Sequence, residues 1–269
     1  MDWFKGRGET DAFIAEQRCQ KVFIDDSKSD SRNSMTILAG VDGCKFGWVC
    51  ITKDLENGTL NSLIFRSSAE LFAQTPTPAV FAIDIPIGLT ESGPRQCDIQ
   101  ARRLLGARRG TSVFPAPIRP VLNVANREEA DKIHRSIDGR GVNVFSWNLY
   151  PRIRDVDAEL QKNSQLRDMV YEVHPELSFT ALNDGVPIVA AKRNPTGESI
   201  RRSLVENHFG SSAFDEIRKN HYMKDVSNHD INDAFAVLWT AQRILSGNAV
   251  SIPTEIEFDS VGLRMGIWY

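Results

Sequence analysis

The sequence predicts an α/β fold built on a sheet of mixed strand direction, and three observations indicate it. Residues 36–65 contain three apolar segments joined by short polar turns, which is typical of an antiparallel meander. A further apolar segment, residues 79–83, follows a short helical stretch, so we expect it to run parallel to the first strand. Residues 230–245 carry an apolar stripe at helical spacing, which predicts a long helix packed on the sheet.

The composition is that of an ordinary globular protein with a sizeable core. Hydrophobic residues make up 41% of the 269 residues and charged residues 25%, and the net charge is -3. Because the whole chain is slightly acidic, any contact with nucleic acid has to come from local basic patches. None of the four cysteines forms a C-x-x-C pair, and no apolar run is long enough to cross a bilayer. We expect a reduced, cytoplasmic protein that does not contact membranes.

The first 34 residues differ in character from the rest of the chain. They are polar and mixed in charge, and they end in the segment DDSKSDSRNS, which has the composition of a disordered chain. Met35 stands directly before the first apolar segment. We therefore expect a dispensable, disordered leader over residues 1–34 and a single domain over residues 35–269. The alternative is that the leader is a functional arm.

Turn residues and prolines set the boundaries of the expected elements. Gly43 and Gly47 bracket a polar turn between the first two strands, and Asn57-Gly58 favours a hairpin turn before the third. Strands are expected within residues 36–52 (two strands), 60–65, 79–83 and 168–174, and residues 262–269 are expected to form a terminal strand or a docked tail. Helices are expected at residues 68–74, 93–110, 126–137, 148–161, 196–208 and 230–245.

Two aspartates follow the strands that we expect to be parallel neighbours. Asp42 and Asp84 each stand where an apolar strand ends. The carboxyl ends of parallel strands meet at one edge of a sheet, where α/β proteins bind their ligands. Either residue alone is explained as well by a turn or a helix cap. Their equivalent positions favour a shared site.

Three more acidic residues extend this set. Glu172 interrupts an apolar strand, although an edge strand with one wet face explains it equally well. Asp230 and Asp233 lie three residues apart on the late helix, and each precedes an apolar stripe residue by four, so both are expected to face the sheet. The alternative is that they cap the helix and interact with its dipole.

Carboxylates that face one point predict a divalent cation. Two of them about 4 Å apart repel by about 4 kcal/mol at an effective dielectric constant of about 20. Oxygen ligands suit Mg²⁺ or Mn²⁺, and a pair of such ions hydrolyses phosphodiesters in many enzymes. We assign Asp42, Asp84 and Asp233 as metal ligands and catalytic residues, with Asp230 and Glu172 contributing to catalysis.

Basic residues fit a phosphodiester substrate. An arginine-rich segment spans residues 95–109, and a second basic cluster spans residues 192–202. Solvated helix faces explain most of these charges equally well. The expected substrate contacts are Arg102, Arg103, Arg109 and Lys192, with Arg102 favoured as a phosphate contact.

Several segments together resemble an uncharacterised family of predicted RNase H-like nucleases. They are VDGCKFGW, AIDIPIGL, RQCDIQARRLLGARRGTSVFPAPIR, YEVHPELSF and D-x-x-D-A shortly before WTA, and the resemblance covers roughly residues 36–269. It implies an RNase H-like fold, with a five-stranded mixed sheet whose first strand lies between the second and the fourth. It also implies that Asp42, Asp84, Asp230 and Asp233 form the acidic site. It implies less for Glu172, because that superfamily does not always place an acid on this strand.

These observations favour a metal-dependent nuclease acting on DNA or RNA. A nucleotide-binding phosphotransferase or ATPase with an actin-like core is the first alternative, although the turn over residues 43–47 lacks the hydroxyl that such proteins use to bind phosphate. A non-catalytic nucleic-acid-binding module is the second alternative. Neutral residues at the acidic positions would favour this module, but each of these positions carries an acidic residue.

Overall fold

The structure is a computed structural model that describes residues 36–269, so the leader expected over residues 1–34 lies outside the described residues. The strands are β1 (Ile37–Cys44), β2 (Gly47–Asp54), β3 (Leu60–Phe65), β4 (Val80–Ile83), β5 (Val170–Glu172), β6 (Ser251–Phe258) and β7 (Arg264–Trp268). The α-helices are α1 (Ser68–Phe72), α2 (Gln96–Arg109), α3 (Arg127–Asp138), α4 (Val144–Trp147), α5 (Tyr150–Lys162), α6 (Ser164–Met169), α7 (Pro175–Leu182), α8 (Pro195–Phe209), α9 (Ala213–Lys219) and α10 (Asn228–Leu245). The described residues all belong to one compact unit.

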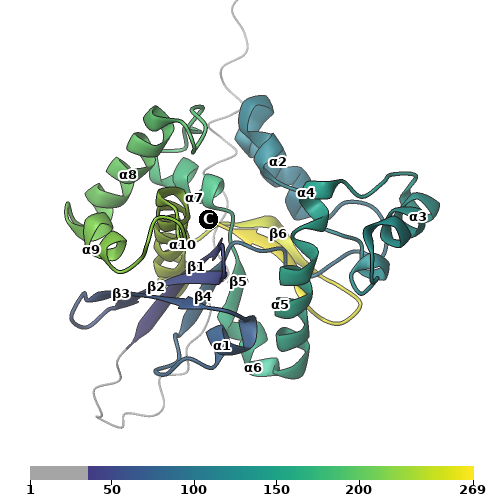
Figure 1. The fold of residues 1–269 in the computed structure, drawn as a ribbon, viewed down its shortest axis with the longest axis horizontal. Coiled ribbons are helices and arrows are strands. Elements are labelled where there is room, and N and C mark those ends of the chain that lie inside the picture. The colour runs from purple at the N-terminus through teal and green to yellow at the C-terminus, as the bar shows by residue number, and fades with distance from the viewer. Residues whose placement is uncertain (1–35) are drawn as a thin grey trace, which may run out of the picture. The chain divides into compact units, whose positions relative to one another are not determined.

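The main sheet mixes antiparallel and parallel strands. Within residues 36–269 it has five strands in the order β3-β2-β1-β4-β5 (Figure 1). β1, β2 and β3 form an antiparallel meander, while β4 pairs parallel to β1 and β5 pairs parallel to β4. The expected α/β fold with a mixed five-stranded sheet is confirmed, and the first strand lies between the second and the fourth.

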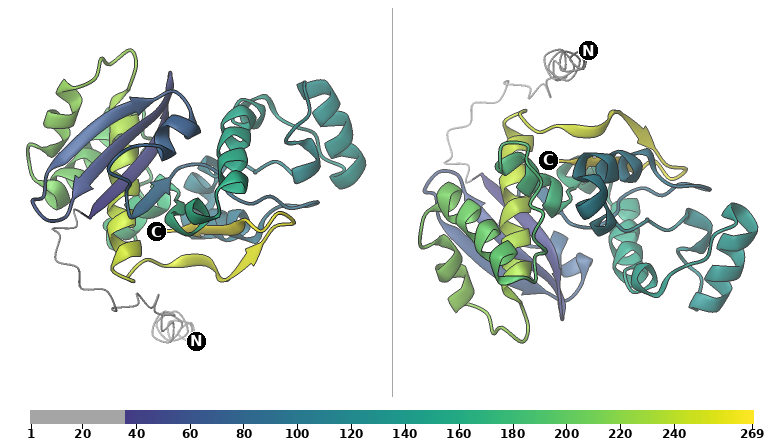
Figure 2. Two further views of the ribbon diagram at one scale, coloured as in Figure 1. Left: turned by 90° about the horizontal axis from the view of Figure 1, so that it is seen from below. Right: turned by 90° about the horizontal axis from the view of Figure 1, so that it is seen from above.

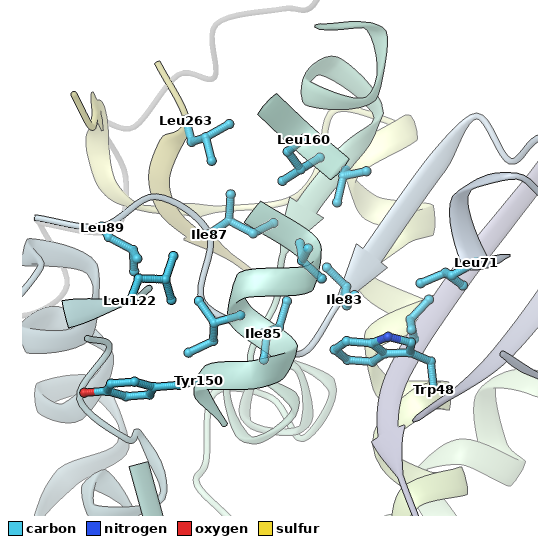
Figure 3. Close-up of a cluster of buried hydrophobic side chains, with 14 of the residues drawn as sticks. Trp48, Leu71, Ile83, Ile85, Ile87, Leu89, Leu122, Tyr150, Leu160 and Leu263 are labelled. Carbon is cyan, nitrogen blue, oxygen red and sulfur yellow. The ribbon is translucent and has the colours of Figure 1, made fainter. Parts of the chain in front are cut away.

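Different helices cover the two faces of the sheet, because side chains alternate along each strand. On one face, sheet residues such as Trp48 and Ile83 pack with Leu71 of α1 and Leu160 of α5, as Figure 3 shows. On the other face, residues such as Leu38 pack with α10. Figure 2 shows α10, in yellow-green, running across the purple and blue strands. The inner strands β1 and β4 are therefore buried on both sides, whereas the edge strand β3 leaves Leu63 exposed.

α10 is the central helix of its face, and it lies unusually close to β1. A Cβ atom at Gly40 would be 2.3 Å from the carbonyl oxygen of Ala234 and 2.4 Å from the backbone nitrogen of Leu238. No side chain fits at residue 40 without moving the helix away from the strand. Gly40 lies two residues before Asp42, and Ala234 directly follows Asp233, so this contact also brings two of the predicted site residues together.

The first hairpin is longer than expected. β1 continues to Cys44 and β2 begins at Gly47, so the turn contains Lys45 and Phe46 rather than residues 43–47. Asp42 therefore does not end its strand on this side, because it pairs with Val49 of β2. On the side of β4, the parallel pairing stops one residue earlier, at Val41.

The strand expected over residues 168–174 is shorter in the structure. Its first residues belong to α6, which runs to Met169, because the Asn163 side chain caps this helix by accepting a hydrogen bond from Gln165 N at 3.0 Å. β5 is left with residues 170–172.

The strand expected at the C-terminal end is confirmed as β7, but it lies in a separate two-stranded sheet and meets the main one through a parallel bridge from Trp268 to Val173, directly after β5. It pairs antiparallel with β6, which the sequence patterns did not predict. Apolar residues of α2, α7, β6 and β7 share a third buried cluster, including Ala101, Leu177 and Ile267. This cluster fixes α2 against α7, close to the end of β5. Among the described residues, no helix is long and apolar enough to cross a lipid bilayer.

We expect Gly40→Ala to destabilise the protein by about 3 kcal/mol, because the added methyl group overlaps the backbone of α10. Chemical denaturation measures the change. Gly58→Ala is the control: Gly58 has a φ of 74° and open space around its Cβ position, so only the left-handed conformation is penalised, by about 1 kcal/mol. An equal decrease in the free energy of unfolding in both variants would contradict the close approach of β1 to α10.

Candidate functional site

The parallel pairing of β1 with β4 places Asp42 and Asp84 side by side. Val41 and Ile83 are the last paired residues, and the Asp84 backbone N–H donates to the Val41 carbonyl at 3.0 Å. Each aspartate directly follows one of these two residues, so both side chains turn to the face of α10. The Asp84 carboxyl group lies within hydrogen-bonding reach of the Asp42 carboxyl group. This is the arrangement that the two strand ends predicted.

α10 adds a third carboxylate, and a lysine lies against it. The Asp233 side chain is 1% exposed, and its Oδ2 accepts a hydrogen bond from Lys192 Nζ at 2.5 Å. Asp233 Oδ1 is buried and has no hydrogen-bond partner within residues 36–269. The charges of Asp42 and Asp84 also act on Lys192. We call Asp42, Asp84 and Asp233 the acidic cluster. Among the described residues, Lys192 supplies the one ammonium group close to it.

The electrostatics of the acidic cluster follow from burial and mutual repulsion. Burial raises the pKa of Asp42 well above its ordinary value, and the negative charges of Asp233 and Asp84 raise it further. Burial also raises the pKa of Asp84, while His174 and Lys192 oppose this shift. In return, the carboxylate of Asp233 raises the pKa of Lys192, so the ammonium group keeps its proton. Lys192 therefore partly compensates the three crowded acids, and His174 assists at Asp84.

A buried ion-pair network positions the segment that carries Lys192. Arg201, which is fully buried, donates through Nη1 to the Ala190 carbonyl at 3.0 Å. Its Nη2 donates to both carboxylate oxygens of Glu176, at 2.9 and 2.7 Å. Arg109 of α2 also reaches Glu176, at 2.5 Å. The network thus joins α2, α7 and α8 to the backbone two residues before Lys192.

The structure does not bring Glu172 to the acidic cluster. Glu172 pairs with Ile83 in the sheet, and its side chain lies on the face opposite to α10. There it accepts hydrogen bonds from two nitrogens of Arg95, both at 2.7 Å, and from the Ile87 backbone N–H at 2.6 Å. Arg95 also contacts Asp98 at 2.6 Å. The buried guanidinium group pairs with both acids and ties β5 to the start of α2. Burial nevertheless raises the pKa of Glu172 to about 7.

Asp230 lies at the N-terminus of α10 and caps the helix. Its Oδ2 accepts from the Ser227 backbone N–H at 2.8 Å, and the Ser227 hydroxyl accepts from Asp230 N at 3.3 Å. This reciprocal pair is a capping box. The charge of Asp230 still raises the pKa of Asp42, although less than Asp233 and Asp84 do. Asp230 therefore starts the helix that carries Asp233 and adds negative charge from one turn away.

The predicted substrate contacts are placed in different environments. Arg102 donates to the Val113 carbonyl from Nε and Nη2, at 3.1 and 2.8 Å, so it holds the proline-rich loop against α2. Arg109 and Lys192 are engaged by carboxylates, as described above. Arg103 is exposed on α2 and lines an open depression together with residues of the loop.

Two residues beside the acidic cluster were not among the predicted site residues. His174 follows β5, and its charge lowers the pKa of Asp84. Its place within the segment YEVHPELSF was the signal that could have found it. Arg152 of α5 donates to the Cys44 carbonyl, and its guanidinium carbon lies 5.7 Å from the centre of the Trp48 ring. Arg152 is separated from Cys44 by 108 residues, and no local pattern points to this contact.

The chemistry of the acidic cluster suits a hard divalent cation. It offers carboxylate oxygens from β1, from α10 and from the residue after β4, and none of the described residues donates to the buried Asp233 Oδ1. As the side chains stand in residues 36–269, no three His, Cys, Asp or Glu residues are arranged to hold a metal ion. The cation in contact with Asp233 is the ammonium group of Lys192.

Comparison with known proteins assigns the chain to a family. The family model described as Protein of unknown function (DUF429) matches residues 40–257, and the chain belongs to this family. The expectation of an uncharacterised family is confirmed, and the matched span contains Asp42, Asp84, Lys192 and Asp233. No curated protein and no solved structure matches the chain.

The raised pKa values of Asp42 and Asp84 predict how stability changes with pH. Because the folded protein holds protons that the unfolded chain releases, stability falls as the pH rises above the ordinary aspartate value of about 4. Asp42→Asn removes one of these acids, so it should stabilise the metal-free protein by about 1 kcal/mol or more near pH 7. The gain should vanish below about pH 4.

Denaturation in a chelator, across this pH range, measures the effect. Asp131→Asn is a control of opposite sign, because Arg135 and the Val142 backbone N–H lower the pKa of Asp131, and this variant should lose stability near neutral pH. If Asp42 is only a turn residue satisfied by backbone donors, Asp42→Asn should instead cost about 1 kcal/mol.

Proposed function

We propose that this member of the DUF429 family is a divalent-metal-dependent nuclease whose site is the acidic cluster of Asp42, Asp84 and Asp233. The observation that carries the proposal is the convergence of three carboxylates, buried Asp42 on β1, buried Asp233 on α10 and half-buried Asp84 directly after β4, beside the ammonium group of Lys192. Such crowding destabilises a fold unless a positive ligand offsets it, so it is more readily explained by function than by stability.

Mg²⁺ or Mn²⁺, when bound, would supply an activated water and would stabilise the leaving oxygen of a phosphodiester. Asp42, Asp84 and Asp233 would hold it, and the unpaired Oδ1 of Asp233 is the oxygen most available to it. The burial of Asp42 and Asp233 keeps bulk water away, so their charges act through a medium of low polarity. Glu172 and Asp230 support this site through the fold, by fixing β5 and by starting α10.

Features at the rim of the site suit a nucleic acid. The turn between β1 and β2 follows Asp42 closely and exposes the ring of Phe46. Lys45 Nζ lies 5.0 Å from the centre of the Phe46 ring. An exposed aromatic ring next to a cation can stack on a base and contact a phosphate. A further exposed positive charge, Arg103, lies on α2 and lines the open depression beside the proline-rich loop. The actin-like alternative gains no support from this turn, because neither Lys45 nor Phe46 carries a hydroxyl group.

Purified protein should cleave at least one member of a panel of labelled single-stranded, duplex, hybrid and branched nucleic acids, and only with Mn²⁺ or Mg²⁺ present. Asp42→Asn, Asp84→Asn and Asp233→Asn each remove a metal ligand and should reduce the rate at least about 100-fold. Asp131→Asn, on the surface of α3, is the matched control and should cleave at the wild-type rate. Cleavage that survives all three cluster variants would identify a contaminant or another site.

Binding should weaken as salt rises, because each phosphate contact releases counterions. The double variant Lys45→Ala and Arg103→Ala should bind every sequence more weakly. In a plot of the logarithm of the binding constant against the logarithm of the salt concentration, its slope should be shallower by about one unit for each lost phosphate contact. Fluorescence anisotropy with labelled oligonucleotides measures both quantities. Lys162→Met is the control, because Lys162 is exposed and bound to Glu159 on α5. Equal affinity and slope in the double variant would remove this rim from the substrate path.

A further inference from the structure

The proposed metal site already contains a cation that belongs to the chain. We propose that Lys192 is an internal counter-ion that competes with the divalent metal for the acidic cluster and thereby limits its metal affinity. The proposal rests on the proposed function for the identity of the metal site, but it concerns binding alone and does not require cleavage.

The contact distances place the ammonium group where a metal would otherwise act. Lys192 Nζ lies 2.5 Å from Asp233 Oδ2, and the Asp233 side chain is 1% exposed. The charge of the same ammonium group acts to lower the pKa values of Asp42 and Asp84, which burial raises. Lys192 therefore interacts with all three carboxylates. A metal bound to these oxygens would meet a positive charge only a few ångströms away. Two positive charges about 4 Å apart in a partly buried site repel strongly, so the two cations cannot both bind well.

The position of Lys192 is built into the fold. Arg201 is fully buried and holds the Ala190 carbonyl at 3.0 Å, and the same side chain is fixed by Glu176. Gly197 of α8 touches the same segment so closely that a Cβ atom there would lie 2.2 Å from the Ala191 carbonyl oxygen. A lysine on a solvated loop would not need such support.

The side chain of Lys192 can nevertheless leave the acidic cluster. It is 38% exposed, whereas its partner Asp233 is buried, so the flexible stem of the lysine has a path to solvent. A divalent ion brings two positive charges where the ammonium group brings one. The crowded carboxylates therefore bind the metal more strongly than they bind the ammonium group. Lys192 lowers the metal affinity of the acidic cluster without abolishing metal binding.

The test is a titration of metal-free, full-length protein with Mn²⁺, in which electron paramagnetic resonance measures the free ion. Lys192→Met removes the charge and keeps the length of the side chain, so it should bind Mn²⁺ at least about tenfold more tightly than the wild type. Lys192→Gln is a second neutral variant, in case the first does not fold. Lys192→Arg keeps the charge, and Lys162→Met removes an exposed ion pair elsewhere. Lys192→Arg should bind Mn²⁺ less tightly than either neutral variant, and Lys162→Met should retain the affinity of the wild type.

Tighter binding confined to the two neutral variants of Lys192 supports competition. Equal or weaker binding by the folded neutral variants, or no Mn²⁺ binding by any of the proteins, overturns it. Because the titration contains no nucleic acid, the result is independent of cleavage. A protein that shows the competition but cuts none of the nucleic acids would retain this inference and lose the proposed nuclease activity.

Discussion

The close approach of β1 to α10 is the contact on which the rest of the structure depends. It requires Gly40, because any side chain at this position would overlap the helix backbone near Ala234 and Leu238. The strand contributes Asp42 and the helix contributes Asp233, so the distance between these carboxylates is set by the packing of two backbones. A core contact of this kind resists expansion, since interiors are close-packed. The mutual repulsion of the acids is therefore borne by the fold instead of being relieved by movement.

Two buried ionic systems lie on opposite faces of the main sheet, and their charges are balanced differently. Around Arg95, the guanidinium group meets Glu172 and Asp98 at hydrogen-bonding distance, and several donors satisfy the carboxylates. Around Lys192, one ammonium group faces three acids and leaves an oxygen of Asp233 without a donor. A satisfied buried ion pair suits a structural role, whereas an undersatisfied one retains affinity for a further cation. This contrast separates the structural acid from the candidate metal ligands.

Much of the fold was predictable, because it depends on local patterns. The strand trio, the parallel strand before Asp84 and the long helix were each visible in hydrophobic periodicity and turn residues. β5 was misplaced at its start because Asp168 and Met169 have no local feature that excludes a strand, and it is the Asn163 cap that makes them helical. The β6–β7 pair was incompletely predicted because half of the β6 residues are exposed and this strand pairs with β7 near the end of the chain.

The sequence by itself determined which carboxylates could meet, since Asp42 and Asp84 follow apolar strands and Asp233 continues an apolar helical stripe. Only the tertiary structure decided which acids have partners. Arg95 is 77 residues from Glu172, and Lys192 is 41 residues from Asp233. An ion pair depends on the distance between two side chains in space, and no periodicity or spacing in the chain encodes that distance. For this reason Glu172 and Asp42 look alike in the sequence, yet Glu172 is held by Arg95 and the Ile87 backbone N–H, whereas Asp42 lies among like charges.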